Sequence, residues 1–396
     1  MNREEVTTSI LNSKKAYILA EMPTSFGKSK IALDWLDRRV KKTDKILIVI
    51  PRLVLIENWK DEFKKWGYQK YLNQVTFVTY VSFPKKAGNW DIVIFDEVHH
   101  LSERCRDSLD SFTIKTAIML SATVKRDFKR VLPQYFPGIE MYYVGAKNAI
   151  DEGILPDPKV FLLPLYLDNT TSKYEIIKNK TKGNPLIIPY RDKWKYNVKH
   201  RKIVIKCTQA QYYQDVTSFI EWCRKRIHME IYKNMFLHKS GDRLKWLSDE
   251  KTTIVRHILS LLKGQRTLTF CNGIPQTEQL GTNCINSKNK EAANILDNFN
   301  AGYINHITAC NMLDEGVNLV NCRVGVYASL NSSERMITQK LGRILRHKDP
   351  IIIIPFFKGT RDEEIVKKMC ENYNSKLIQT INNLNELKKC LNNLKD

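Results

Sequence analysis

The sequence lacks a hydrophobic run that could cross a membrane, and it lacks the cysteine spacing of a metal site. A bilayer-spanning helix needs about 18 or more apolar residues, whereas the longest runs here are 46–50 and 351–357. The nine cysteines contain no Cys-x-x-Cys pair, so reduced thiols are expected rather than a zinc cluster. The first ten residues hold two acids and no apolar core, unlike a signal peptide. We therefore expect a cytoplasmic protein, in the host cytoplasm if its source is a virus, without a membrane partner.

Acidic residues are too few to balance the basic ones. The 396 residues include 64 Lys and Arg against 42 Asp and Glu, which gives a formal net charge of +22 at pH 7. Such an excess predicts a polyanionic partner, with nucleic acid the first candidate and an anionic membrane the second. Hydrophobic residues make up 43% of the chain, enough to build sizeable cores, so the chain is not wholly disordered.

Short β-branched runs alternate with amphipathic segments in two parts of the chain. This alternation predicts parallel sheets covered by helices. We predict an α/β protein with two parallel-sheet lobes and a mainly helical, basic connector between them. The expected limits are 1–150 for the first lobe, 151–250 for the connector or insertion, 251–365 for the second lobe and 366–396 for a helical tail. The expected strands are 16–20, 45–50, 75–78, 92–95, 117–120, 267–270, 306–309, 324–327 and 351–355.

A phosphate-binding loop follows the first expected strand. Residues 22–29 read Met-Pro-Thr-Ser-Phe-Gly-Lys-Ser, which fits G-x-x-x-x-G-K-[ST] except that Met22 replaces the first glycine. Gly27 lets backbone N–H groups face a phosphate, Lys28 can contact the β- and γ-phosphates, and the Ser29 hydroxyl can bind Mg²⁺. A chance Gly-Lys-Ser at a strand–helix turn is the alternative. The residues expected to bind ATP here are Pro23, Thr24, Ser25, Phe26, Gly27, Lys28 and Ser29.

Two carboxylates end the strand expected over 92–95. In a parallel sheet, a carboxylate at the C-terminal end of one strand lies beside the loops that follow its neighbours. Asp96 is therefore expected to hold Mg²⁺ through water, and Glu97 to orient and deprotonate the attacking water. Acidic residues that merely end a strand are the alternative, and the phosphate loop about 70 residues upstream argues against it.

A third candidate cluster lies in the second lobe. The segment 339–346 reads Gln-Lys-Leu-Gly-Arg-Ile-Leu-Arg, and its Arg343 and Arg346 would share one helical face. Guanidinium groups suit a γ-phosphate whose charge spreads in the transition state. A solvated basic helix face is the alternative interpretation.

Together these residues resemble the motor core of the superfamily 2 helicases and translocases. Other segments are similar to the family's remaining motifs and occur in its order: 51–59, Thr79-Tyr80, Ser121-Ala-Thr123, 267–273 and 314–318. The resemblance covers residues 16–357 and implies two RecA-like lobes that bind ATP and Mg²⁺ in the cleft between them, with nucleic acid across both. Weaker similarities favour its DNA-acting group, which includes phage recombination helicases and restriction-enzyme motor subunits.

The resemblance also implies roles for individual residues. It adds Gln339 to Glu97, Arg343 and Arg346 as catalytic residues. It implies that Gly316 and Asn318 bind ATP and that His99, Ser121 and Thr123 couple the motifs. It also implies that Arg52, Thr79 and Tyr80 bind nucleic acid. Two departures matter. Cys310 and Asn311 replace the usual Thr-Asp of the fifth motif, and no glutamine precedes Lys28 to read an adenine base.

A basic segment occupies residues 173–206. It holds eleven Lys or Arg and two acids, a net charge of +9 over 34 residues, with four aromatic residues interleaved. Cations can pair with phosphates and aromatic rings can stack on bases, so we expect a nucleic-acid track; a solvated loop is the alternative. The residues predicted to contact nucleic acid in this segment are Lys193, Trp194, Lys195, Lys199 and Arg201.

The sequence thus predicts an ATP-driven DNA helicase or translocase. An RNA helicase with the same motor is one alternative. A non-motor, ATP-gated clamp on nucleic acid is another, and the presence of Glu97 and both arginines argues against it.

Overall fold

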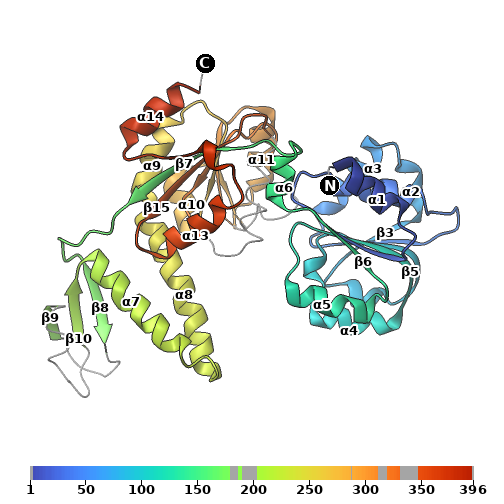
Figure 1. The fold of residues 1–396 in the computed structure, drawn as a ribbon, viewed down its shortest axis with the longest axis horizontal. Helices are drawn as coiled ribbons and strands as arrows, with labels where there is room; N and C mark the ends of the chain where they lie inside the picture. The colour runs from blue at the N-terminus through green and yellow to red at the C-terminus, as the bar shows by residue number, and fades with distance from the viewer. Residues whose placement is uncertain are drawn as a thin grey trace.

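The protein forms two lobes, each built on a parallel sheet, and a smaller unit of three strands and two long helices (Figure 1). The computed structural model describes residues 3–178, 186–189, 203–286, 288–310, 319–330 and 347–394. The predicted fold class is confirmed. Among these residues no helix is both long and apolar enough to cross a membrane.

The first lobe contains six parallel strands in the order β3-β2-β4-β5-β1-β6. All five strands expected here are present, and β6 joins them at one edge. The strands are β1 (Tyr17–Glu21), β2 (Ile46–Ile50), β3 (Val75–Thr79), β4 (Gly88–Phe95), β5 (Phe112–Ser121) and β6 (Glu140–Tyr143). The helices are α1 (Arg3–Asn12), α2 (Lys28–Asp37), α3 (Leu55–Lys65), α4 (Glu103–Asp107), α5 (Arg126–Tyr135) and α6 (Ala146–Asp151), with 3₁₀ turns at Gln69–Gln74, Phe83–Lys86, Val98–His100 and Ser108–Ser111.

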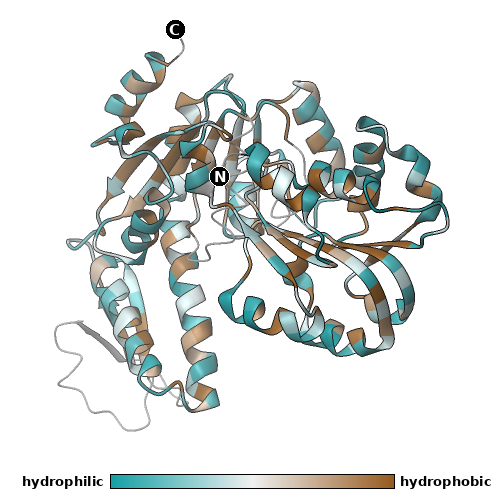
Figure 2. Cartoon of the chain, turned by 45° about the vertical axis from the view of Figure 1, so that its right-hand side comes forward, coloured by the Kyte–Doolittle hydropathy of each residue, from teal (hydrophilic) through white to brown (hydrophobic). Residues whose placement is uncertain are grey.

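Both faces of the first sheet are buried. Side chains alternate between the faces of a strand, so Ile48 of β2 packs in one core and Val49 in the other. Sheets covered on both sides read as continuous apolar runs, and Figure 2 shows the strands of this lobe as mainly hydrophobic. The helices on both faces thus leave the ends of the strands as the place for polar groups.

The second lobe contains seven parallel strands in the order β12-β13-β11-β14-β15-β7-β16. The strands are β7 (Lys159–Leu165), β11 (Thr267–Phe270), β12 (Cys284–Ile285), β13 (His306–Ala309), β14 (Val324–Tyr327), β15 (Ile351–Phe357) and β16 (Ile378–Thr380). The helices are α9 (Thr252–Leu261), α10 (Ile274–Leu280), α11 (Ala292–Ala301), α13 (Arg361–Cys370) and α14 (Leu384–Asn392), with a 3₁₀ turn at Ser375–Leu377.

The position of β7 shows where the chain enters the second lobe. β7 pairs with β15 on one side and with β16 on the other. The second sheet therefore includes residues 159–165, which the sequence analysis assigned to the connector. It also includes β16 (Ile378–Thr380), which lies in the expected tail. The segment between β7 and α9 is an excursion that leaves this lobe and returns to it.

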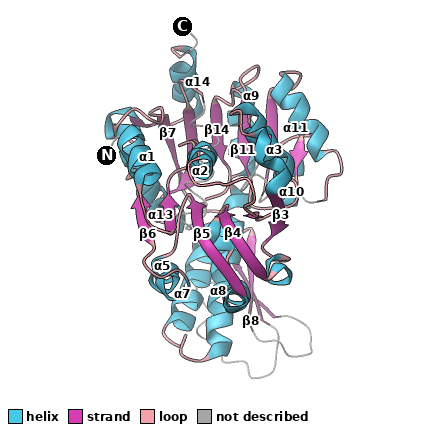
Figure 3. Ribbon diagram, turned by 90° about the vertical axis from the view of Figure 1, so that its right-hand side faces the viewer, coloured by secondary structure: helices cyan, strands magenta, loops and turns pink. Residues whose placement is uncertain are grey.

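That excursion forms the smaller unit. β8 (Tyr174–Lys178), β9 (Leu186–Pro189) and β10 (Ile203–Cys207) pair in the order β8-β10-β9. α7 (Gln209–Arg224) and α8 (Glu230–Glu250) follow as a helical hairpin that extends away from the second sheet (Figures 1 and 3). Thr208 and Gln211 form a capping box at the start of α7, which explains where the helix begins.

A buried ion pair fixes the base of the hairpin to the second lobe. Lys251 lies between α8 and α9, and its Nζ donates to Asp362 Oδ2 at 2.7 Å, with both side chains at most 1% exposed. Gln276 Nε2 also donates to the carbonyl of Ser248 at 2.7 Å. Removing one partner of a buried pair costs about 3–5 kcal/mol. The base of the hairpin is therefore firmly joined to this lobe.

Candidate active site

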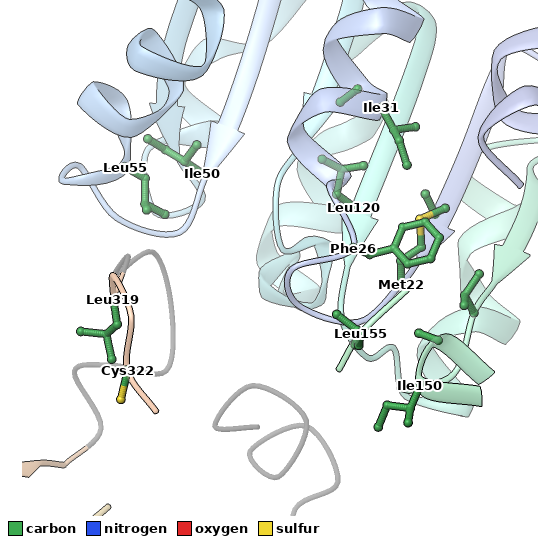
Figure 4. Close-up of a cluster of buried hydrophobic side chains, with 14 of the residues drawn as sticks. Met22, Phe26, Ile31, Ile50, Leu55, Leu120, Ile150, Leu155, Leu319 and Cys322 are labelled. Carbon is green, nitrogen blue, oxygen red and sulfur yellow. The ribbon is translucent and has the colours of Figure 1, made fainter. Parts of the chain in front are cut away.

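The phosphate loop connects β1 to α2 and adopts an unusual backbone conformation. Ser25 and Gly27 have φ values of +72° and +100°, whereas Met22 is not among the residues with positive φ. The first position of the motif therefore does not require glycine here. The Met22 side chain is buried with Phe26 beside Leu155 and Ile150 (Figure 4). The methionine that departs from the usual motif thus anchors the loop in the core.

Gly27 is favoured at its position because its φ of +100° is a conformation that L side chains rarely adopt. The end of the Arg3 side chain on α1 lies close to it, since a Cβ there would be 2.5 Å from Nη2 of Arg3. Gly27 immediately precedes α2, whose first N–H groups have no partner within the helix and attract anions. The loop has the open backbone that a phosphate needs.

Lys28 is the first residue of α2. Its Nζ donates to the carbonyl oxygens of Met22 and Pro23, at 3.0 and 3.4 Å. The ammonium group therefore lies over the loop that would surround the phosphates. Ser29 follows it and lines the same cavity.

Asp96 follows β4 and is held through both its main chain and its side chain. Its backbone N–H donates to Val49 of β2 at 2.8 Å. Its carboxylate Oδ2 accepts a hydrogen bond from Trp59 Nε1 at 2.9 Å, and its carbonyl accepts one from the Tyr80 hydroxyl at 2.8 Å. The predicted metal ligand is thus fixed by three neighbouring segments.

Glu97 takes a left-handed conformation, with φ +51°. Strained residues of this kind cluster at functional sites. Its Oε2 lies 3.3 Å from Nδ1 of His99 and 3.4 Å from Oγ of Ser121. His99 Nδ1 lies 2.9 Å from that same hydroxyl, and the Thr123 N–H donates to it at 3.3 Å. The three residues expected to couple the motifs therefore form one network with the expected base.

A cavity of about 590 Å³ brings these groups together. Thr24, Ser25 and Gly27–Ser29 line one side, and Asp96 and Glu97 line another. Arg3, the α3 residues Glu62 and Lys65, and Trp66 just after α3 also line this cavity, and the sequence analysis did not identify them. Asn58 and Trp59 line it too; they lie in the segment 51–59, for which the sequence analysis gave no residue a place at the nucleotide. Trp59 repeats at helical spacing with Phe63, a pattern typical of core packing, so its spacing alone did not indicate a contact with Asp96.

The residues around the cavity fit Mg²⁺ and a nucleoside triphosphate. Carboxylate and hydroxyl oxygens are the ligands that Mg²⁺ prefers, and Asp96 and Ser29 supply one of each. The loop that Gly27 keeps open suits phosphate. Among the described residues no cluster of three or more His, Cys, Asp or Glu could hold a metal by itself.

The residues expected to contact nucleic acid differ in exposure. Arg52 is exposed in the loop between β2 and α3, and Thr79 at the end of β3 is half-buried. Tyr80 is only 4% exposed, and its hydroxyl points at the backbone of Asp96. Its position is therefore that of a core residue beside the cavity.

Several predicted site residues lie outside the described residues. They are Gly316, Asn318, Gln339, Arg343, Arg346, Lys193, Trp194, Lys195, Lys199 and Arg201. Their roles stay predictions from the sequence. Cys310, which departs from the usual fifth motif, is buried at the end of β13.

Both lobes match known protein families. Residues 2–126 match the family described as the type III restriction enzyme res subunit, and residues 250–348 match the helicase conserved C-terminal domain. The chain is 25% identical over 393 residues to a DNA 3'-5' translocase, XPB2, of Sulfurisphaera tokodaii, covering 93% of this chain and 83% of the relative.

Solved structures share the fold. The structure of Dbp5 of S. cerevisiae bound to RNA and ADP BeF3 matches with a TM-score of 0.64 at 10% identity, covering 100% of this chain and 93% of that one. A fragment of a putative HsdR subunit of a type I restriction enzyme from Vibrio vulnificus matches with a TM-score of 0.56 at 15% identity, covering 96% and 67%. These likenesses concern the two-lobe architecture alone.

Proposed function

Because the chain belongs to the superfamily 2 helicases and translocases, we propose that it couples ATP hydrolysis to movement along DNA. The observation that supports this most is the convergence of the phosphate loop, Asp96 and the network of Glu97, His99 and Ser121 on one cavity. The XPB2 relative is a DNA translocase, and the net charge of +22 suits a polyanionic track.

Each group around the cavity has a role in this proposal. Lys28 would leave the loop carbonyls and bind the β- and γ-phosphates. Ser29 and Asp96 would hold Mg²⁺, which when bound neutralises charge on those phosphates. Glu97 would orient the attacking water and accept its proton. The His99–Ser121 contact would connect this base to the segment that follows β5.

The second lobe would complete the site. Arg343 and Arg346 would reach the γ-phosphate when the lobes close, and their charge would stabilise the transition state more than the bound substrate. Repeated closing and opening of two lobes on one strand would move that strand. Gly316 and Asn318 would contact ATP from the same lobe.

ATPase assays with duplex DNA, single-stranded DNA and RNA, compared side by side, test the proposal. We expect DNA to stimulate turnover more than RNA. Stimulation by RNA alone would indicate an RNA helicase. Binding of ATP and nucleic acid without turnover would indicate a non-motor clamp. Either result would contradict the proposal.

The basic segment 173–206 is proposed as part of the DNA track. Replacing Lys193, Lys195, Lys199 and Arg201 with alanine should weaken DNA binding equally for all sequences. If all four contact phosphates, the log–log salt slope should become shallower by up to about 3.6 on duplex DNA, since each phosphate contact contributes about 0.9. Titrations at several salt concentrations measure this slope. An unchanged slope and affinity would show that these four residues do not contact DNA.

A further inference from the structure

Two hydrogen bonds converge on Asp96 from segments that follow neighbouring strands of the sheet. Trp59 Nε1 donates to its carboxylate at 2.9 Å, and the Tyr80 hydroxyl donates to its carbonyl at 2.8 Å. Trp59 is 3% exposed and Tyr80 is 4% exposed, so water competes little for either bond. One bond orients the side chain, and the other holds the backbone from which it projects.

Trp59 follows β2, the neighbour of β4 in the sheet. Tyr80 follows β3, which lies one strand further from β4. β2 pairs with β4, and β3 pairs with β2. After β2 the chain passes through an exposed loop, where Leu53 is 69% exposed, and then enters α3, which places Trp59 in its second turn. After β3 come buried Tyr80 and then Val81, which is 82% exposed. Each donor thus lies close in sequence to a surface-exposed residue at the same end of the sheet.

The chemistry of the indole suits an orienting role. A neutral N–H donor can fix the rotation of a carboxylate without competing with the metal, because it adds no positive charge. Partners that hydrogen-bond to metal-binding carboxylates commonly set metal affinity, and their removal typically costs about 10–100-fold. The Trp59 indole occupies such a place beside Asp96.

We propose that Trp59 is a positioning residue that orients the Asp96 carboxylate for Mg²⁺, through the 2.9 Å indole hydrogen bond. This inference rests on the proposed function, because it requires Asp96 to serve as the metal ligand. A packing role is the competing explanation, since Trp59 also lies against Phe63 with ring centroids 6.4 Å apart.

The substitution Trp59→Phe separates the two roles, because it keeps a buried ring and removes the N–H. We expect the Mg²⁺ concentration for half-maximal binding of a fluorescent, non-hydrolysable ATP analogue to rise about 10-fold. Binding of the analogue in EDTA and the melting temperature should stay close to wild type. Trp90→Phe is the matched control. Trp90 lies on β4, the strand that leads to Asp96, but its indole N–H donates to the carbonyl of Lys86 at 3.0 Å and not to Asp96.

A second pair of variants keeps the test decisive if Trp59→Phe does not fold. Trp59→His and Trp59→Leu lose similar packing, but only histidine keeps a ring N–H. The His variant should therefore retain more of the Mg²⁺ response than the Leu variant. Equal responses in the two would overturn the proposal.

The outcomes distinguish this inference from the proposed function. If analogue binding by the wild type depends on Mg²⁺ and Trp59→Phe leaves that dependence unchanged, the inference alone is overturned. A lower melting temperature of the variant without a change in its Mg²⁺ dependence would likewise overturn it. A wild-type protein whose analogue binding ignores Mg²⁺ would overturn the proposed function as well.

Discussion

The Lys28→Ala variant should lose ATP turnover while its affinity for DNA without nucleotide stays nearly intact. Lys28 supplies the positive charge over the phosphate loop, and its hydrogen bonds are to the carbonyls of Met22 and Pro23 within that loop. Arg52, an expected nucleic-acid contact, lies instead in the exposed loop that begins at Pro51 after β2, so the substitution should leave that contact unchanged. Steady-state hydrolysis and DNA-binding titrations of the same preparation measure both properties.

Lys115→Ala is the control for that experiment. It also removes one lysine from the first lobe, but Lys115 pairs with Asp91 and is not among the residues that line the cavity. This variant should hydrolyse ATP as the wild type does. Normal turnover by Lys28→Ala would show that residues 22–29 are not the phosphate site.

Arg343→Ala and Arg346→Ala should each lower the maximal rate of ATP hydrolysis by about 10³-fold or more, as expected for arginine fingers. Nucleotide binding should be retained, because these groups act on the transition state more than on the ground state. Measuring kcat together with the affinity for a non-hydrolysable ATP analogue separates the two effects. Both residues lie outside the described residues, so this prediction comes from the sequence.

The control for the arginine variants is Arg361→Ala in the same lobe. The Arg361 side chain pairs with Glu364 one turn along α13, and exposed pairs of this kind contribute little to stability. Its hydrolysis rate should equal that of the wild type. Should either arginine variant bind the analogue weakly yet reach the normal maximal rate, the arginine would have a ground-state role instead.

The sheets and the first motifs could be predicted because local sequence specifies them. β2 and the second half of β4, residues 92–95, are buried on both faces, so each appears as a continuous apolar run. The phosphate loop and the Asp96-Glu97 pair each follow such a run directly. Because parallel strands end at one edge of a sheet, their predicted positions already brought them close together.

The partners of several segments depended on the tertiary structure. β7 is a short apolar segment whose neighbour β15 comes nearly 190 residues later, and a local pattern does not specify so distant a partner. For the same reason the sequence placed residues 159–165 in the connector. The departure at Met22 could be explained only by its negative φ and by the core residues around it.

Charge, motif order and strand positions were thus determined by the sequence itself, since each depends on residue type and on neighbours along the chain. The role of α3 was decided only by the fold. Trp59 has the spacing of a core residue, and the carboxylate it contacts lies 37 residues away. Tyr80, expected at the nucleic-acid surface, lies instead in the core beside Asp96. A hydrogen bond between distant residues exists only once the strands have paired, because that pairing brings the ends of β2, β3 and β4 together.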